Sequence, residues 1–166
     1  MITRNDVIQA LSTLDPRLST LILSFIPIIE PRFAIWAGVT IYGMPPLEAL
    51  AVTITGLFIL SLVITLLIEG ILDSAREGML SRIPLLQRFV VWLENRSLEK
   101  ASPLIKRYGW IGLVAFVAVP LPFTGVYTGS IASVLLGIKG KRMFTGLFVG
   151  GLISVLINFM VILGYY

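Results

Sequence analysis

The stretch Tyr108–Ile138, YGWIGLVAFVAVPLPFTGVYTGSIASVLLGI, decides how this chain can fold. Its last 29 residues carry no formal charge. As one straight helix they would be roughly 43 Å long, well beyond the ~30 Å hydrocarbon core of a bilayer. Pro120 and Pro122 make that helix improbable, because each removes a backbone donor and clashes with the preceding turn. The pattern therefore predicts two short helical arms, roughly 110–119 and 126–137, that meet at a bend.

Arms of this length cover about half a bilayer, so we expect segment 110–138 to enter the membrane, turn inside it and leave on the same face. Non-helical backbone at membrane depth is tolerated where protein or a wet cavity satisfies it, and broken helices are typical of transport sites. Segment 18–43 is also apolar and broken by two prolines, with Glu30 and Arg32 between its arms. We expect it to form a second re-entrant hairpin.

The composition is that of an integral membrane protein, because 57% of the residues are hydrophobic and 13% are charged. The net charge of +4 does not indicate nucleic acid as a partner, since the basic residues cluster in loops beside apolar segments. The chain has no cysteine and no histidine. This excludes disulfides, thiolate and imidazole metal ligands and Ser-His-Asp triads, so we expect no enzyme, no metal and no cofactor. We also expect no cleavable signal peptide.

Two uninterrupted apolar segments, 47–68 and 143–166, are each long enough to span a membrane. Residues 1–16 are predicted to form a short interfacial helix, and residues 72–107 a cytoplasmic or interfacial amphipathic region. The predicted fold class is therefore an all-α integral membrane protein with a single membrane domain. It repeats a re-entrant (broken) helix hairpin followed by a transmembrane helix, with the amphipathic helix between the repeats.

A trace of the repeat is visible in the spanning segments, because TGLFILSLVI (Thr55–Ile64) and TGLFVGGLIS (Thr145–Ser154) share their first four residues and a later leucine. Charge suggests the orientation. If both hairpins return to the side from which they enter, the basic segment 69–107 and the basic turn 139–142 lie on one face, the cytoplasmic one. The two halves then have opposite orientation, and the chain is a multi-pass protein of the cell membrane with its site near the midplane.

Glu30 and Arg32 are the sharpest candidates for function. An ionised side chain at membrane depth costs several kcal/mol, so such residues usually face a cavity or a partner. Glu30 could act as a proton-binding carboxylate, and the guanidinium of Arg32 is a natural fork for a phosphate. The alternative is a structural ion pair that pins the tip of the hairpin.

The second tip offers hydroxyls, free carbonyls and a helix N-terminus near Gly125, which favours an anion. Its candidate residues are Pro120, Pro122, Thr124, Gly125, Tyr127 and Thr128. The alternative is a bend that only packs against its twin.

Other polar and small residues in the apolar segments have structural interpretations. Glu69 and Asp73 are expected to be solvated charges at a helix end. Gly146 and Gly150 form a small-xxx-small pair, which favours helix packing. Asn158 is expected to hydrogen-bond a neighbouring helix.

The two tips, PIIEPRFAIWAG (27–38) and PLPFTGVYTGSIAS (120–133), resemble the signature segments of the small archaeal and bacterial membrane proteins named small multidrug export proteins, a family similar to the DedA/VTT superfamily. The resemblance covers roughly residues 20–166. The matching positions are Glu30, Arg32, Ala34, Ile35, Pro120, Leu121, Pro122, Thr124, Gly125, Thr128 and Gly129. The departures are Pro31, Phe33, Trp36, Phe123, Val126 and Tyr127, of which Phe33 and Phe123 replace glycines at the two bends.

The resemblance to the DedA/VTT superfamily implies two opposed re-entrant hairpins and the movement of lipids. Our leading prediction is accordingly a translocase for a polyprenyl-phosphate or a similar anionic lipid. Arg32 would hold the phosphate, Glu30 would couple a proton, and Thr124, Gly125 and Thr128 would line the opposite side of the pocket.

Two alternatives are open. The first is a small-molecule exporter that uses Glu30 for proton exchange against cationic drugs, and the second, from another class, is a membrane scaffold that transports nothing. The expected partners are membrane lipids that carry an anionic or phosphate group, with protons and a second copy of the chain, as a homodimer, left open. Nucleic acid is not expected.

Overall fold

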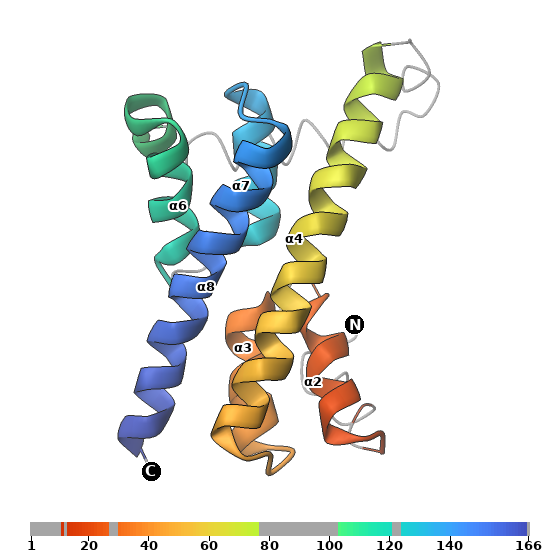
Figure 1. The fold of residues 1–166 in the computed structure, drawn as a ribbon, viewed down its shortest axis with the longest axis vertical. Coiled ribbons are helices and arrows are strands. Elements are labelled where there is room, and N and C mark those ends of the chain that lie inside the picture. Colours follow the sequence, from red (N-terminus) through yellow and green to blue (C-terminus); the bar gives the residue numbers. More distant parts are fainter. Residues whose placement is uncertain (1–10, 12, 27–29, 77–102, 121–123, 166) are drawn as a thin grey trace, which may run out of the picture. The chain divides into compact units, whose positions relative to one another are not determined.

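The computed structural model describes residues 11, 13–26, 30–76, 103–120 and 124–165. Within these ranges every regular element is a helix (Figure 1), so the predicted all-helical class is confirmed for the described part of the chain. Residues 103–108 add a short helical stretch. The longer helices are α2 (Pro16–Ser24), α3 (Glu30–Thr40), α4 (Pro46–Arg76), α6 (Trp110–Ala118), α7 (Val126–Leu135) and α8 (Gly140–Tyr165).

Two of the described helices are long and apolar enough to cross a membrane, as predicted. They are the 23-residue Pro46–Ile68 part of α4 and the 26-residue α8, Gly140–Tyr165, which at ~1.5 Å per residue are about 35 and 39 Å long. Both lengths exceed the ~30 Å hydrocarbon core. Residues 72–76, the start of the predicted amphipathic region, continue α4 as helix.

The first broken segment begins with α2. Asp15-Pro16, at the end of the segment 1–16 that we expected to form an interfacial helix, caps and starts α2. The Asp15 carboxylate accepts a hydrogen bond from the backbone N–H of Arg17 over 2.9 Å, and Pro16 occupies the first turn. Both positions suit a helix N-terminus, since aspartate caps free N–H groups and proline has none to leave unsatisfied. α2 ends at Ser24 and α3 begins at Glu30.

The second broken segment was expected to have arms at 110–119 and 126–137. In the structure α6 ends at Ala118, and the backbone of Val119 is extended. α7 begins after Gly125 and ends at Leu135. Gly137 follows that end with a φ of 78°, in the left-handed region. A glycine adopts this conformation at a helix end without the steric cost that a Cβ would bring.

The chain divides into two compact units. Unit 1 comprises Met1–Leu60 and Gly151–Tyr166, and unit 2 comprises Ser61–Gly150. Unit 1 therefore holds α2 and α3 with the first part of α4 and the last part of α8. Unit 2 holds α6 and α7 with the remaining parts of the two long helices. Each unit thus contains one of the two broken segments.

Small residues let the helices of unit 1 approach closely. A Cβ placed on Gly56 of α4 would lie 2.7 Å from the Cβ of Ser24 on α2, and one on Gly38 of α3 would lie 3.0 Å from Oγ1 of Thr20. α2 buries a polar face in this way. Contacts of this kind are typical of helix packing in membranes, where van der Waals fit replaces the hydrophobic driving force.

Unit 2 uses glycines of α8 for the same purpose. A Cβ on Gly146 would lie 2.7 Å from the Leu113 side chain, and one on Gly150 would lie 2.7 Å from the carbonyl oxygen of Val114 and 2.8 Å from Val117. All three partners are on α6. The predicted packing role of the Gly146/Gly150 pair is therefore confirmed.

Several predictions fall outside the described residues. These are most of the interfacial helix at 1–16, the amphipathic region over 77–102, and the side chains of Glu69 and Asp73. The re-entrant path of the hairpins and the inverted repeat also stay predictions.

Candidate functional site

A buried ion pair stands at the start of α3. The Nη2 of Arg32 donates a hydrogen bond to Oε2 of Glu30 over 2.7 Å. Only 7% of the Arg32 side chain and 10% of the Glu30 side chain is exposed. Such a pair is sensitive to any change in either partner, because removing one charge leaves the other buried without compensation. The structure thus brings together the two charged residues that the sequence singled out.

The backbone of Glu30 adopts a conformation that side chains rarely take. Its φ is 56°, and its N–H donates to the carbonyl oxygen of Ile26 over 2.9 Å. A non-glycine residue in the left-handed region costs about 1–3 kcal/mol and persists where the surroundings enforce it, often at functional sites. As the first residue of α3, the negative Glu30 also faces the positive end of the helix dipole.

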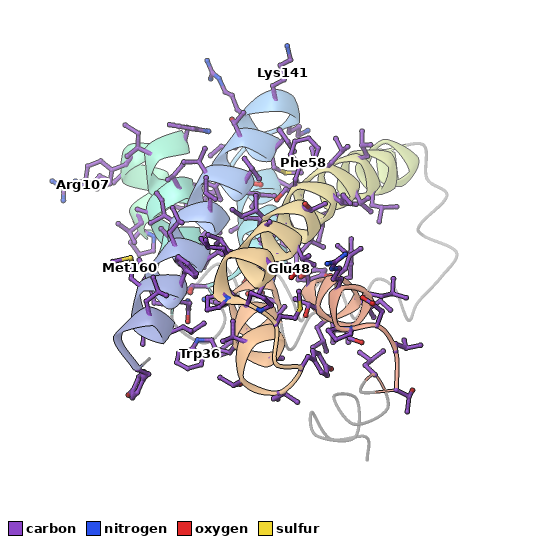
Figure 2. All side chains as sticks on the ribbon, turned by 60° about the horizontal axis from the view of Figure 1, so that its bottom comes forward. Trp36, Glu48, Phe58, Arg107, Lys141 and Met160 are labelled. Carbon is purple, nitrogen blue, oxygen red and sulfur yellow. The ribbon has the colours of Figure 1, made fainter. Side chains whose placement is uncertain are left out.

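Unit 1 contains a second ion pair that serves as a reference for the first. Arg17 of α2 pairs with Glu48, which lies in the first turn of α4. Glu48 is labelled in Figure 2. Here 70% of the Arg17 side chain and 32% of the Glu48 side chain is exposed. Exposed pairs contribute ~0–1 kcal/mol, since water screens them. The two pairs therefore differ in burial.

A tryptophan ties α3 to α8 within unit 1. The indole Nε1 of Trp36 (Figure 2) donates to Oδ1 of Asn158 over 3.0 Å, and Nδ2 of Asn158 donates to the carbonyl oxygen of Ser154 over 2.8 Å. The ring of Tyr165 meets the Trp36 ring edge to face, with centroids 6.2 Å apart. The predicted hydrogen bond of Asn158 to a neighbouring helix is confirmed. Because Trp36 is one turn beyond Arg32, this contact also fixes the ion pair relative to α8.

The second tip uses its hydroxyls on its own backbone. Thr124 is buried, and its Oγ1 donates to the carbonyl oxygen of Val119 over 2.6 Å. This bond closes the bend between α6 and α7. Oγ1 of Thr128 donates to the carbonyl oxygen of Gly125, the N-cap of α7, over 3.4 Å. These hydroxyls therefore stabilise the tip's own bend, while both interpretations of the tip, an anion site and a bend that packs against its twin, stay predictions.

The other predicted residues of this tip lie in different surroundings. Pro120 is exposed, and Tyr127 is half-buried. Pro122 lies outside the described residues. The two tips belong to different units, each of which is described by itself, so their predicted convergence stays a prediction.

Sequence reasoning missed three buried hydroxyl groups in the long helices. The side-chain oxygens of Thr53, Ser61 and Ser154 have no hydrogen-bond partner within the described residues. Other hydroxyls in the helices, such as that of Thr65, donate to the carbonyl oxygen four residues earlier. A signal was available, because these are polar residues inside otherwise apolar spanning segments.

Residues 30–157 match the model of the family described as "Putative small multi-drug export protein". The match begins at Glu30 and includes Arg32, the second tip and most of both long helices. The chain belongs to this family. No curated protein and no solved structure was found to match it.

The family and the two long apolar helices together indicate a membrane location. The family match confirms the resemblance to the small multidrug export proteins. No match links the chain to the DedA/VTT superfamily, so that relationship, and the lipid movement it implies, stay predictions.

Proposed function

We propose that this protein exports small organic molecules across a membrane, and that the Glu30–Arg32 pair is the place where substrate and proton act. The observation that carries the proposal is the burial of this pair, in which Glu30 also has a left-handed backbone conformation. Intramembrane ionisable residues mark substrate and proton pathways. A member of a family described as export proteins is expected to contain such a site.

Each partner in the pair can be displaced by a different species. A proton or an organic cation would compete with Arg32 for the Glu30 carboxylate, and an anion would compete with Glu30 for the guanidinium. Arg32 itself keeps its charge, since an arginine does not lose its proton in proteins. A carboxylate that binds either a proton or its other partner, but not both, couples proton movement to the opening of the pair. This is the chemistry that proton-driven export requires.

The exporter takes the place of the lipid-phosphate translocase as our main hypothesis, because the family match names export and nothing in the comparisons supports DedA-like lipid movement. A lipid phosphate remains one anionic species that could act on Arg32. A scaffold without transport predicts that substitutions of Glu30 and Arg32 change stability alone.

We also propose that the two broken segments are re-entrant and that the halves of the chain form an inverted repeat. The arms have 9, 11, 9 and 10 residues, and at ~1.5 Å per residue each is about 14–17 Å long, half of what a span needs. Transporters of this architecture change access by rocking one repeat against the other. The basic residues at 106–107 and 139–142 would then face the cytoplasm.

The test is export from cells that express the wild-type protein, Glu30→Gln or Glu48→Gln. Two fluorescent probes of opposite charge, ethidium and carboxyfluorescein, cover both ways of opening the pair. We expect wild type to lower the accumulation of at least one probe, Glu30→Gln to abolish that effect, and Glu48→Gln to retain it. The control removes a carboxylate from an exposed ion pair in the same unit.

Two results would count against the proposal. If wild type exports neither probe relative to cells without the protein, the export function is wrong. If Glu30→Gln exports as well as Glu48→Gln at equal protein levels, the assignment of the site is wrong.

A further inference from the structure

Two buried hydroxyl groups of unit 1 remain without a described partner. Thr53 on α4 is 0% exposed and Ser154 on α8 is 3% exposed. No residue in the described part of the chain hydrogen-bonds either side-chain oxygen. Burying a hydroxyl without a partner is costly, and buried polar groups in native proteins nearly always have one. A ligand with matching atoms would remove that cost.

The crossing of α4 and α8 places these two hydroxyls at one level. A Cβ on Gly151 of α8 would lie 2.5 Å from Cδ1 of Leu57 on α4, so the two helices touch at these residues. The helices run in opposite directions (Figure 1). Thr53 precedes Leu57 by four residues and Ser154 follows Gly151 by three, so both lie about one turn from the contact in the same direction. These spacings also keep each hydroxyl on the face that its helix presents to the other.

The tie between α3 and α8 brings Arg32 to the same level. α3 and α8 run in the same direction (Figure 1), and Trp36 hydrogen-bonds Asn158. Arg32 precedes Trp36 by four residues, and Ser154 precedes Asn158 by four. Arg32 and Ser154 are therefore both one turn before the hydrogen bond, on the faces that α3 and α8 turn to each other.

We propose that Arg32, Thr53 and Ser154 form an oxyanion site, which takes a carboxylate or phosphate group of the transported molecule. Three helices of unit 1 contribute one donor group each. A guanidinium binds planar oxyanions with two parallel hydrogen bonds, and a hydroxyl adds a directed donor. The oxyanion takes over Arg32 from the Glu30 carboxylate. This inference rests on the proposed function and names its substrate class.

The hydroxyls favour an anion over an organic cation. An ammonium or an aromatic cation would occupy the Glu30 carboxylate and displace the Arg32 guanidinium toward the two hydroxyls, which carry no charge and cannot neutralise it. An oxyanion instead restores the charge balance of Arg32 and accepts from both O–H groups. The same chemistry is found in a free carboxylate or phosphate and in the headgroup of an anionic lipid.

The experiment measures binding of four probes to the purified full-length protein in neutral detergent micelles. Phenylacetate and phenyl phosphate are soluble oxyanions, phenylacetamide is the uncharged match, and phosphatidate supplies a lipid phosphate. The variants are Thr53→Val and Ser154→Ala, which remove one hydroxyl each with little change of shape. The control is Thr55→Val, because the Thr55 hydroxyl is exposed and donates to the carbonyl oxygen of Ala51.

We expect wild type to bind at least one oxyanion and not phenylacetamide, and Thr53→Val and Ser154→Ala each to weaken that binding about tenfold, which is ~1.4 kcal/mol. Thr55→Val should bind as wild type does. Binding of phosphatidate alone identifies the lipid headgroup as the source, and binding of the soluble probes identifies a small molecule; both outcomes support the site. Oxyanion affinities unchanged in Thr53→Val and Ser154→Ala overturn it, as does a wild type that binds none of the three oxyanions.

A thermal melt separates this role from a structural one. Removing a buried hydroxyl without a partner should leave the melting temperature unchanged or raise it, whereas loss of a structural hydrogen bond lowers it. If Thr53→Val does not fold, Thr53→Ser takes its place, because serine keeps the hydroxyl donor. Thr53→Ser should bind the oxyanion with wild-type affinity. If it weakens binding as much as Ser154→Ala does, the proposal is overturned. Failure of the two proposals is distinguishable: export of carboxyfluorescein that ignores Thr53 and Ser154 refutes the oxyanion site alone, and oxyanion binding without export refutes the export function alone.

Discussion

Removing one charge of the Glu30–Arg32 pair should destabilise the protein far more than removing both. In Arg32→Met the Glu30 side chain, which is only 10% exposed, stays buried, and its carboxylate loses the guanidinium that lies 2.7 Å away. Breaking a buried pair in this way costs about 3–5 kcal/mol, whereas replacing both charges is often close to neutral. We therefore expect Arg32→Met to lower the free energy of unfolding by about 3 kcal/mol or more. The double variant Glu30→Gln/Arg32→Met should regain most of that loss.

The exposed Arg17–Glu48 pair gives the matched control. Its side chains are 70% and 32% exposed, so Arg17→Met, Glu48→Gln and their double variant should each change the stability by ~0–1 kcal/mol. The assay is reversible unfolding in mixed detergent micelles, followed by tryptophan fluorescence, with a double-mutant cycle for each pair. A coupling energy for the buried pair no larger than that of the exposed pair would refute the reasoning, because burial would then have no effect on the cost of an isolated charge.

Two further predictions concern helix packing and topology. Gly112→Ala should lower the free energy of unfolding by about 1–3 kcal/mol, because its Cβ would lie 2.2 Å from a backbone carbonyl oxygen. The control Gly70→Ala, whose Cβ would have no atom within 4 Å, should be neutral or stabilising by up to ~1 kcal/mol. Equal effects of the two substitutions would show that the close contact at Gly112 is absent. The chain has no cysteine, so single cysteines can report topology: a membrane-impermeant thiol reagent should label Lys106→Cys and Lys141→Cys from one side of the membrane and Arg17→Cys from the other. Labelling of Lys106→Cys and Lys141→Cys from opposite sides would exclude a re-entrant second hairpin.

The positions of the helix breaks follow from single residues in the sequence. Pro120 removes a donor and α6 ends two residues before it, and Gly125 precedes α7, as the sequence predicted. The pairing of Glu30 with Arg32 was also accessible, because two opposite charges in an apolar segment are costly unless they meet. Asp15-Pro16 suits the start of α2, where the Asp15 carboxylate accepts a hydrogen bond from the backbone N–H of Arg17 and Pro16 has no N–H to leave unsatisfied.

The remaining features depend on contacts between distant segments. Nothing in the local sequence tells whether a serine or threonine in a spanning helix donates to its own backbone, as Thr65 does, or has no hydrogen-bond partner among the described residues, as is the case for Thr53. The left-handed backbone of Glu30 is likewise unexpected for a residue with a long side chain. The bond between Trp36 and Asn158 joins residues 122 positions apart, and it follows from the packing of α3 on α8.

The most direct test of the account is transport by the purified protein in lipid vesicles under an imposed pH gradient. With carboxyfluorescein or ethidium as the probe, we expect the gradient to drive movement of at least one of them through wild type and Glu48→Gln, together with a measurable proton flux. Glu30→Gln should show neither movement of the probe nor proton flux. If Glu30→Gln moves the probe at the wild-type rate, the ion pair at the start of α3 is not the site of exchange.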